Sequence, residues 1–275
     1  MSEQSQRSPL TGAVVLASLL FLYVPLAIVV LFSFHSTGSL SFPFDGFSLR
    51  WYRDVLDSGE FRSAFQNSLV VASVTAVASL LLGTAAAYGL TKAPRLLRGP
   101  LAFLFFIPLT LPGLFMGIGL LSWFTQLDVQ ASLTTVAIAH VVYVLPYFLL
   151  IAGAALDRLD PALEECAMDL GANTWQIFWR VTMPIIWPLL AGATALAFAL
   201  SFDEFIITFF VIGSDSTLPM FIWSSLRRTV DPSINVVSTL LMAITILLWV
   251  IAFAFTVRSE RTRRGERALA EGLIA

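Results

Sequence analysis

The 275-residue chain is 57% hydrophobic and only 12% charged, with a formal net charge of −2 at pH 7. Soluble domains carry roughly a quarter of charged residues, so this composition excludes an ordinary soluble protein and indicates a membrane protein. A bilayer core about 30 Å thick requires roughly 20 apolar helical residues to cross it. Six stretches meet this length, at residues 10–34, 68–90, 101–124, 131–152, 185–212 and 236–257.

These stretches are expected to be helices, because a helix satisfies its own backbone hydrogen bonds inside hydrocarbon. Barrel strands would be shorter and would alternate in polarity, which these stretches do not. The first stretch follows a short tail with one arginine, Arg7, and is too long for the apolar core of a cleaved signal peptide. We therefore predict an all-α membrane protein with an N-terminal tail (1–9), a six-helix transmembrane domain (10–257) and a C-terminal tail (258–275).

The distribution of the sixteen Lys and Arg residues predicts the orientation. With both termini in the cytoplasm, eleven of these cations fall on the cytoplasmic side: Arg7, Lys92, Arg95, Arg98, Arg158, Arg180, Arg258, Arg261, Arg263, Arg264 and Arg267. The other five fall outside: Arg50, Arg53, Arg62, Arg227 and Arg228. Cytoplasmic loops carry an excess of Lys and Arg, which favours this arrangement. The loop at residues 157–184 is then cytoplasmic.

This cytoplasmic loop carries the start and stop signals of two short helices. Asp160 followed by Pro161 is typical of a helix N-terminus, and Gly171 is a good C-terminal stop. Asn173 with Gln176 three residues later predicts a second start, and the chain is expected to return into the membrane from residue 184. We expect a helix, a tight turn and a second helix.

Three aromatic residues of the second helix, Trp175, Phe178 and Trp179, are spaced so that they share one face. Such a face could lie on the membrane surface, as interfacial tryptophans often do. The preceding helix, however, carries the acids Glu164, Glu165 and Asp169, which an anionic inner leaflet would repel. A protein partner therefore fits this loop better.

The same loop carries a motif. Glu165, Cys166 and Ala167 are followed after three residues by Gly171, and nine residues later by Val-Thr-Met-Pro at 181–184. This pattern resembles the EAA loop of permease subunits in binding-protein-dependent ABC importers, which reads Glu-Ala-Ala, three residues, Gly, nine residues, Ile-x-Leu-Pro. The departures are mild, because Cys replaces Ala, Val replaces Ile and Met replaces Leu.

The resemblance implies a type I ABC importer permease fold, in which this loop is a coupling helix that docks on a cytoplasmic ATPase. Glu165 would be its main charged contact, with apolar contact from Met168, Leu170 and Ala172. Gly171 would let a backbone approach closely. The full set of residues expected to couple to the ATPase is Glu164, Glu165, Ala167, Met168, Asp169, Leu170, Gly171 and Ala172.

Hydrolysis of ATP is expected to belong to another subunit. A phosphate-binding P-loop requires a Gly-Lys pair, whereas the one lysine, Lys92, follows Thr91. His35 and His140 are assigned to different spans, and the single cysteine, Cys166, excludes an intrachain disulfide and a Cys-based zinc site. We expect no catalytic residue, no metal site and no directly bound cofactor, with ATP and Mg used by the partner ATPase.

A narrower resemblance concerns the substrate. The stretches FSLRWYRDVL, NSLVVASVTAVASLLLGTAAAYGL and SFDEFIITFFVIG resemble the second permease subunit of spermidine and putrescine importers. This implies an inner-membrane complex with an ATPase dimer, a second and non-identical permease, an extracytoplasmic solute-binding protein, surrounding lipid and no nucleic acid. One departure is Gly113, where that branch often carries an acid. Another small organic solute therefore stays open, as does a passive channel or secondary transporter.

Two acids stand out within the spans. Asp203 and Glu204 are the only acidic residues of the six stretches, and acids in hydrocarbon are functional candidates. They could attract a cationic substrate, or they could pair with Arg227 or Arg228 of the following outer loop. Trp51 and Tyr52, after the first span, could offer cation-π faces to the same substrate or serve as interfacial anchors.

Two further features of the spans predict helix packing. His140 in the fourth span is expected to hydrogen-bond across helices as a neutral imidazole, in preference to relaying protons. Gly113 and Gly117 form a Gly-x-x-x-Gly pattern in the third span, a common signal for close helix contact.

Overall fold

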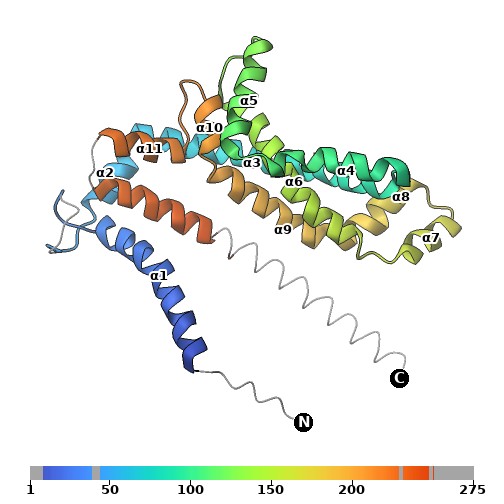
Figure 1. Cartoon of the computed structure of the whole chain (residues 1–275), viewed down its shortest axis with the longest axis horizontal. Coiled ribbons are helices and arrows are strands. Elements are labelled where there is room, and N and C mark those ends of the chain that lie inside the picture. The colour runs from blue at the N-terminus through green and yellow to red at the C-terminus, as the bar shows by residue number, and fades with distance from the viewer. Residues whose placement is uncertain (1–8, 39–43, 229–231, 248–249, 251–275) are drawn as a thin grey trace. The chain divides into compact units, whose positions relative to one another are not determined.

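The computed structural model describes residues 9–38, 44–228, 232–247 and 250 (Figure 1). The chain divides into two compact units, one made of Met1–Arg62 with Ile222–Ala243 and the other of Ser63–Phe221 with Ile244–Ala275. The described residues are helical apart from turns, loops and one isolated bridge between His35 and Phe47. The helical prediction is therefore confirmed for this part of the chain.

The first unit contains α1 (Pro9–Ser33) and the short helix α2 (Arg50–Asp57). The segment between them folds back on the end of α1, because the Ser36 N–H donates to the Gly46 carbonyl at 3.0 Å and the Ser48 N–H donates to the Phe34 carbonyl at 2.7 Å. Helix α11 (Leu218–Arg228) and an apolar helix at Pro232–Leu247 also contribute to this unit.

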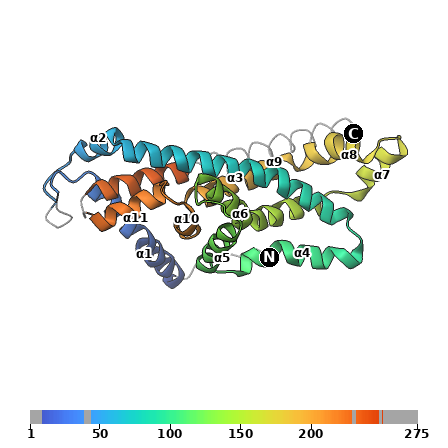
Figure 2. The ribbon, with the colours of Figure 1, turned by 90° about the horizontal axis from the view of Figure 1, so that it is seen from above.

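The second unit is built on α6 (Leu133–Leu156) and α9 (Met183–Phe202), which pack along each other. Val144 and Phe148 of α6 and Ile186 and Leu190 of α9 are almost fully buried between them. Helix α3 (Gly59–Lys92) runs through this unit, and α4 (Arg95–Thr110) doubles back from its end (Figure 2). Gly83 of α3 makes room for the Phe148 ring, where a Cβ would collide with it. The core is thus a stack of helices whose contacts are mainly apolar, with a few buried polar side chains such as His140 and Ser201.

The third predicted span is not one continuous helix, so the prediction for residues 101–124 is wrong in this respect. Helix α4 ends at Thr110 and α5 (Gly113–Gln126) begins three residues later, at an angle of 106°. Pro112 has no N–H to donate to the preceding turn, and Leu111 before it takes the extended conformation that a following proline favours. The apolar composition predicted the stretch, whereas the proline divides it.

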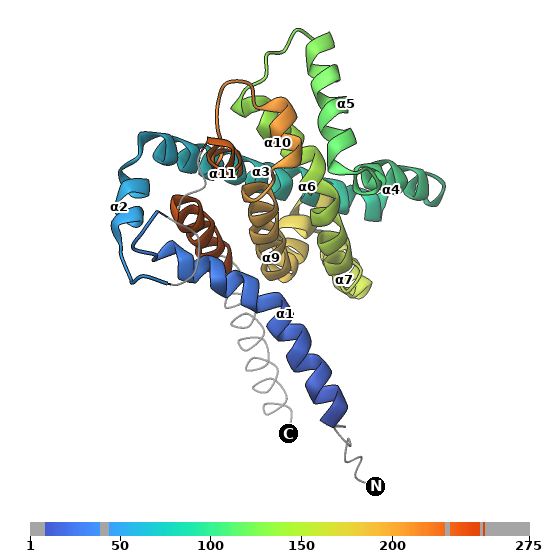
Figure 3. The ribbon, with the colours of Figure 1, turned by 60° about the vertical axis from the view of Figure 1, so that its left-hand side comes forward.

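Helix α5 packs on α10 (Ile206–Val211) through its glycines (Figure 3). A Cβ on Gly117 would lie 2.7 Å from the Phe210 ring and 3.3 Å from the backbone of Ile207. A Cβ on Gly113 would lie 3.7 Å from the Ile206 side chain. The Gly-x-x-x-Gly pattern is therefore a contact between helices of the same chain.

The fifth predicted span is also interrupted. Helix α9 ends at Phe202 and α10 begins at Ile206, so Asp203 and Glu204 lie in the break between them. At its other end, α9 continues without interruption from Thr174, through a π-helical segment η1 (Phe178–Thr182). The helix that returns into the membrane therefore begins ten residues before the predicted position at Pro184.

By length and composition, four described helices can cross a membrane: Thr11–Ser33, Gly59–Lys92, Leu133–Leu156 and Thr174–Phe202. The bent pair α4 and α5 makes a fifth span if it is counted as one. Of the sixth predicted stretch, the structure describes residues up to 247 within the shorter apolar helix Pro232–Leu247, and also residue 250. Residues 248–249 and 251–257, and both predicted tails except Pro9, lie outside the described residues.

Candidate functional site

The loop at residues 157–184 folds as its capping residues predict. The Asp160 carboxylate accepts the Ala162 N–H at 3.0 Å, and Pro161 is the first residue of α7 (Pro161–Asp169). Asn173 and Gln176 form a reciprocal capping box at the start of α8 (Thr174–Ile177), with distances of 2.9 and 3.0 Å. These contacts satisfy the free N–H groups at both helix starts. Both predicted helix N-termini are confirmed.

Gly171 makes the turn between the two helices. Its φ is +82°, a conformation that costs an L side chain about 1–2 kcal/mol and that glycine adopts freely. The Gly171 N–H donates to the Met168 carbonyl at 2.8 Å, and the Ala172 N–H donates to the Ala167 carbonyl at 3.0 Å. These bonds close the end of α7, as expected of a glycine C-terminal stop.

The tip of the loop presents apolar side chains to the outside of the chain. Leu170 is 89% exposed and Trp175 is 69% exposed, while Met168 and Trp179 are also exposed. Four further predicted residues complete the surface: Glu165, Asp169 and Gly171 are exposed, and Ala172 is half-buried beside them. An apolar patch rimmed by acids on a chain surface is typical of a protein interface. We call these eight residues the loop tip.

Phe178 departs from the face predicted for it. Its ring contacts that of Tyr88 from α3, with centroids 4.8 Å apart, so it is half-buried and faces inward. Trp175 and Trp179 remain on the open side, with their ring centroids 5.6 Å apart. The three aromatic residues therefore form one cluster, of which only the tryptophans are open to a partner.

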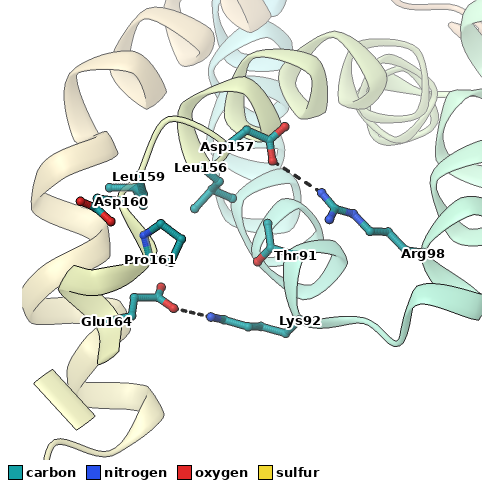
Figure 4. A pocket seen from close by; sticks show the side chains of 9 residues that line it. All are labelled: Thr91, Lys92, Arg98, Leu156, Asp157, Leu159, Asp160, Pro161 and Glu164. Carbon is teal, nitrogen blue, oxygen red and sulfur yellow. Dashed lines mark hydrogen bonds and ion pairs between the residues drawn. The ribbon is translucent and has the colours of Figure 1, made fainter. Parts of the chain in front are cut away.

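Glu164 faces the protein, unlike Glu165. Its carboxylate forms an ion pair with Lys92 at the end of α3 (Figure 4). The same carboxylate accepts the Thr182 hydroxyl proton at 3.1 Å. Only 20% of the Glu164 side chain is exposed. A second ion pair joins Arg98 of α4 to Asp157 at 3.5 Å. Sequence reasoning missed both pairs, because their partners lie more than 50 residues apart in the chain.

These two ion pairs flank a cavity of about 260 Å³ under the loop (Figure 4). Its lining residues come from the last turns of α3 and α6, the first turns of α4 and α7, and the turn between α6 and α7. They are Thr91, Lys92, Arg98, Leu156, Asp157, Leu159, Asp160, Pro161 and Glu164. Ala167, also predicted to couple, lies half-buried in α7. The loop at residues 157–184 is therefore joined by ion pairs to α3 and α4, in addition to its chain connections to α6 and α9.

The acids Asp203 and Glu204 border a second cavity, of about 210 Å³. Its other lining residues are Tyr143, Leu196, Ala199, Leu200 and Thr245. Glu204 also caps α10, since its carboxylate accepts the Ile207 N–H at 2.9 Å. Asp203 is exposed and ends α9. The cavity thus combines two carboxylates with one phenol, one hydroxyl and aliphatic walls. Sequence reasoning missed Tyr143 and Thr245, which carry no local motif.

His140 of α6 joins the two sides of the helix break. Its Nδ1 lies 2.7 Å from the Ser201 hydroxyl of α9, and its Nε2 lies 2.8 Å from the Thr208 hydroxyl of α10. Thr208 donates its own proton to the Glu204 carbonyl at 2.9 Å, so it accepts from Nε2–H and Ser201 donates to Nδ1. Both ring nitrogens are satisfied by a neutral imidazole. The predicted hydrogen bonding of His140 across helices is confirmed.

Trp51 and Tyr52 belong to the other unit. The Trp51 indole donates to the His35 carbonyl at 3.0 Å, and the Tyr52 hydroxyl lies 2.8 Å from that of Ser33. Arg50 lies over the Trp51 ring at 5.5 Å. Both side chains therefore hold α2 to the end of α1. Their predicted contact with substrate stays a prediction.

The alternative ion pair of the acids also stays a prediction. The Arg227 guanidinium lies over the Trp223 ring, 4.8 Å from its centroid. The side chain of Arg228 lies outside the described residues.

Comparison with known proteins identifies the group to which these features belong. A family profile described as binding-protein-dependent transport system inner membrane component matches residues 79–265. The chain is 36% identical over 266 residues to the putrescine transport system permease protein PotI of Escherichia coli (strain K12), covering 94% of each chain. It is 28% identical over 240 residues to the spermidine/putrescine transport system permease protein PotC of the same strain, covering 87% of this chain and 90% of the relative.

A solved structure agrees with this assignment at the level of the fold. A chain of a bacterial alginate ABC transporter, in complex with an alginate pentasaccharide-bound periplasmic protein, matches with a TM-score of 0.71 and 16% identity. The match covers 92% of this chain and 96% of that one. The profile match and the 36% identity together show that the chain belongs to the family of inner membrane components of binding-protein-dependent transport systems.

Proposed function

We propose that this chain forms half of the translocation pathway for a small organic cation, a polyamine such as putrescine or spermidine. As a member of its family it is a multi-pass transport subunit of an ABC importer and not an enzyme. The observation that carries the choice of substrate is the cavity in which Asp203 and Glu204 meet Tyr143 and Thr245. Carboxylates bind ammonium groups through charge-assisted hydrogen bonds, and aliphatic walls suit the methylene chain between two amines. The names of the relatives support the same substrate class.

Uptake is driven by ATP hydrolysis in a partner. The proposed docking surface for a cytoplasmic ATPase dimer comprises Glu165, Ala167, Asp169 and the apolar side chains of the loop tip. Its support is the exposure of Leu170, Met168 and Trp175 on a loop fixed by caps at both helix starts. ATP and Mg belong to the ATPase, and this chain binds no cofactor directly.

The working complex contains a second, non-identical permease subunit and an extracytoplasmic solute-binding protein. It lies in the inner membrane, with both termini of this chain in the cytoplasm. Dependence on a binding protein is part of the family description, and the distribution of Lys and Arg supports the orientation.

The substrate assignment is tested by neutralising the two acids in the assembled complex. Glu204→Gln keeps an oxygen that can accept the Ile207 N–H, and so removes the charge without removing the cap. Because a hydrogen bond to a charged group contributes about 1.5–3 kcal/mol, the Asp203→Asn, Glu204→Gln variant is expected to lower uptake of radiolabelled putrescine by about tenfold or more. Comparison with Glu204→Leu separates the charge of Glu204 from its capping of α10, because the leucine removes both whereas the glutamine removes only the charge.

Two outcomes would reject the cation site. The first is normal putrescine uptake by a well-expressed double variant. The second is a loss of complex stability with no specific loss of uptake, reproduced by charge reversal of Arg227 and Arg228, which would favour the ion-pair alternative. A wild-type complex that moves a different solute would identify another substrate, the alternative that Gly113 favours. Uptake without ATP would indicate a channel or secondary transporter.

A further inference from the structure

We propose that Glu164 acts inside the chain, as a clasp that binds Lys92 and Thr182 and makes the coupling helix move together with the membrane helices. This inference rests on the ATP-driven uptake proposed above. It assigns Glu164 a role different from that of its neighbour Glu165, which faces away from the chain. Lys92, Glu164 and Thr182 are positioning residues, since none of them is part of the proposed docking surface or of the cavity that holds the acids.

The clasp joins three elements through two oxygens of one carboxylate. Oε2 pairs with the ammonium group of Lys92, the last residue of α3. Oε1 accepts the hydroxyl proton of Thr182, the last residue of η1. Glu164 itself lies in the first turn of α7. A single side chain therefore connects the docking helix both to α3 and to the helix that leads toward Asp203 and Glu204.

Burial distinguishes this pair from ordinary surface ion pairs, which contribute about 0–1 kcal/mol and are often unmeasurable. The Glu164 side chain is 20% exposed and Thr182 is fully buried. Lys92, although half-exposed, also lies 5.3 Å from the centre of the Tyr88 ring. The carboxylate is thus held at two points in a partly desolvated site, where its orientation is fixed.

The Glu164 clasp is bonded to the π-helical segment η1, through its last residue Thr182. A π-helical turn inside an α-helix is rare and is often found at functional sites. Here the segment Phe178–Thr182 leads directly into α9. Tyr88 of α3 packs on Phe178 at one end of the segment, and Lys92 of α3 is linked to Thr182 at the other end through the Glu164 carboxylate. A push on α7 therefore reaches α3 and α9 together.

The experiment uses the full complex in proteoliposomes, with the binding protein inside and ATP outside. Two quantities are measured, the factor by which ligand-loaded binding protein stimulates ATP hydrolysis and the number of putrescine molecules moved per ATP. In Lys92→Met and Glu164→Gln, both are expected to fall by about fivefold or more, the lower end of coupling between two sites. ATP hydrolysis without binding protein should persist, because the docking surface is unchanged.

A charge exchange is the specific test. In the Lys92→Glu, Glu164→Lys double variant the ion pair is restored in reverse, and the Thr182 hydroxyl can still accept a hydrogen bond. Both quantities should recover at least half of the wild-type value. The matched control is Arg98→Met, which breaks the exposed pair with Asp157 on the other side of the same cavity and should leave stimulation unchanged.

Three results would overturn the clasp: unchanged stimulation in both single variants, no recovery in the exchanged variant, or failure of both single variants to assemble, which would assign the pair to folding. These outcomes are distinct from a failure of the proposed substrate. A wild-type complex that responds to its binding protein but moves no putrescine would contradict the polyamine assignment, while the stimulation factor would still report on Lys92 and Glu164.

Discussion

The Nδ1 atom of His140 lies 2.7 Å from the hydroxyl of Ser201, in the last turn of the helix that ends at the two acids. On its other side the same ring bonds Thr208, in the first turn of the next helical segment. A break in a membrane helix leaves backbone groups without partners and must be supported by neighbours. His140 supplies this support from α6, so the position of Asp203 and Glu204 depends on a residue that does not line their cavity.

A double-mutant cycle measures this support. His140→Leu removes both ring hydrogen bonds, and Ser201→Ala removes one of them. Hydrogen bonds between membrane helices contribute about 0.6 kcal/mol on average, so the coupling free energy between the two substitutions should be about that size. It is read from thermal unfolding of the purified complex in nanodiscs. Thr194→Ala is the control, because that hydroxyl bonds only the Leu190 carbonyl of its own helix, and its effect should add to that of His140→Leu. If the effects of His140→Leu and Ser201→Ala on stability were strictly additive, the hydrogen bond between the two side chains would be contradicted.

The contact between α5 and α10 predicts a sharp difference between two glycines of one helix. Gly117→Ala should destabilise the complex by about 1–3 kcal/mol, since the new Cβ would lie 2.7 Å from the Phe210 ring. Gly119→Ala should be neutral or stabilising, because nothing lies within 4 Å of its Cβ position. Thermal unfolding of the two variants checks the difference. Phe210→Leu should partly restore the Gly117→Ala variant, and equal effects at the two glycines would show that α5 packs elsewhere.

Substitutions at Gly171 should separate the effect of backbone conformation from the effect of side-chain bulk at the turn between α7 and α8. Gly171→Asn is expected to preserve uptake, because asparagine tolerates a positive φ, whereas Gly171→Ala should weaken the turn by about 1 kcal/mol. Gly171→Trp should leave the complex assembled but uncouple ATP hydrolysis from uptake, because a Cβ at this position points into open space beside the loop, where the proposed partner would dock. Uptake per ATP in proteoliposomes measures all three. Unchanged transport by an assembled Gly171→Trp complex would show that the ATPase does not dock at this turn.

Cys166 offers a direct test of orientation. Its thiol is exposed on α7, so a membrane-impermeant maleimide should label it in inside-out vesicles that have been stripped of the ATPase, and not in intact cells. A cysteine at Ser214, in the exposed turn after α10, should show the opposite pattern in a Cys166→Ala background. Labelling of Cys166 in intact cells would invert the proposed topology.

Local signals in the sequence were sufficient for the coupling loop. Asp160, Gly171 and Asn173 act on atoms within a few residues of themselves, and each occupies its predicted position. The ion pair of Lys92 with Glu164 joins residues that lie 72 positions apart in the chain, and no local sequence pattern predicts it. The inward turn of Phe178 depends likewise on Tyr88 of a distant helix.

Helix continuity shows a second limit. Hydropathy sums over a window and so finds residues 101–124 and 185–212, but it does not register where the backbone leaves the helix. Pro112 gave a usable warning, because a residue before proline avoids helical geometry. The break at Asp203 carries no proline, and it is supported by the side chain of His140, which belongs to a helix more than 60 residues away in the chain.

The bend between α4 and α5 sets an order on biogenesis. Helix α4 has 16 residues and α5 has 14, so they are about 24 Å and about 21 Å long. Neither helix alone crosses a bilayer core about 30 Å thick. The surface that holds α5 at its angle belongs to α10, which begins 80 residues after Gln126 and is therefore synthesised later. The ribosome thus delivers an apolar stretch that Pro112 already divides, and the surface against which its second half packs is synthesised only later.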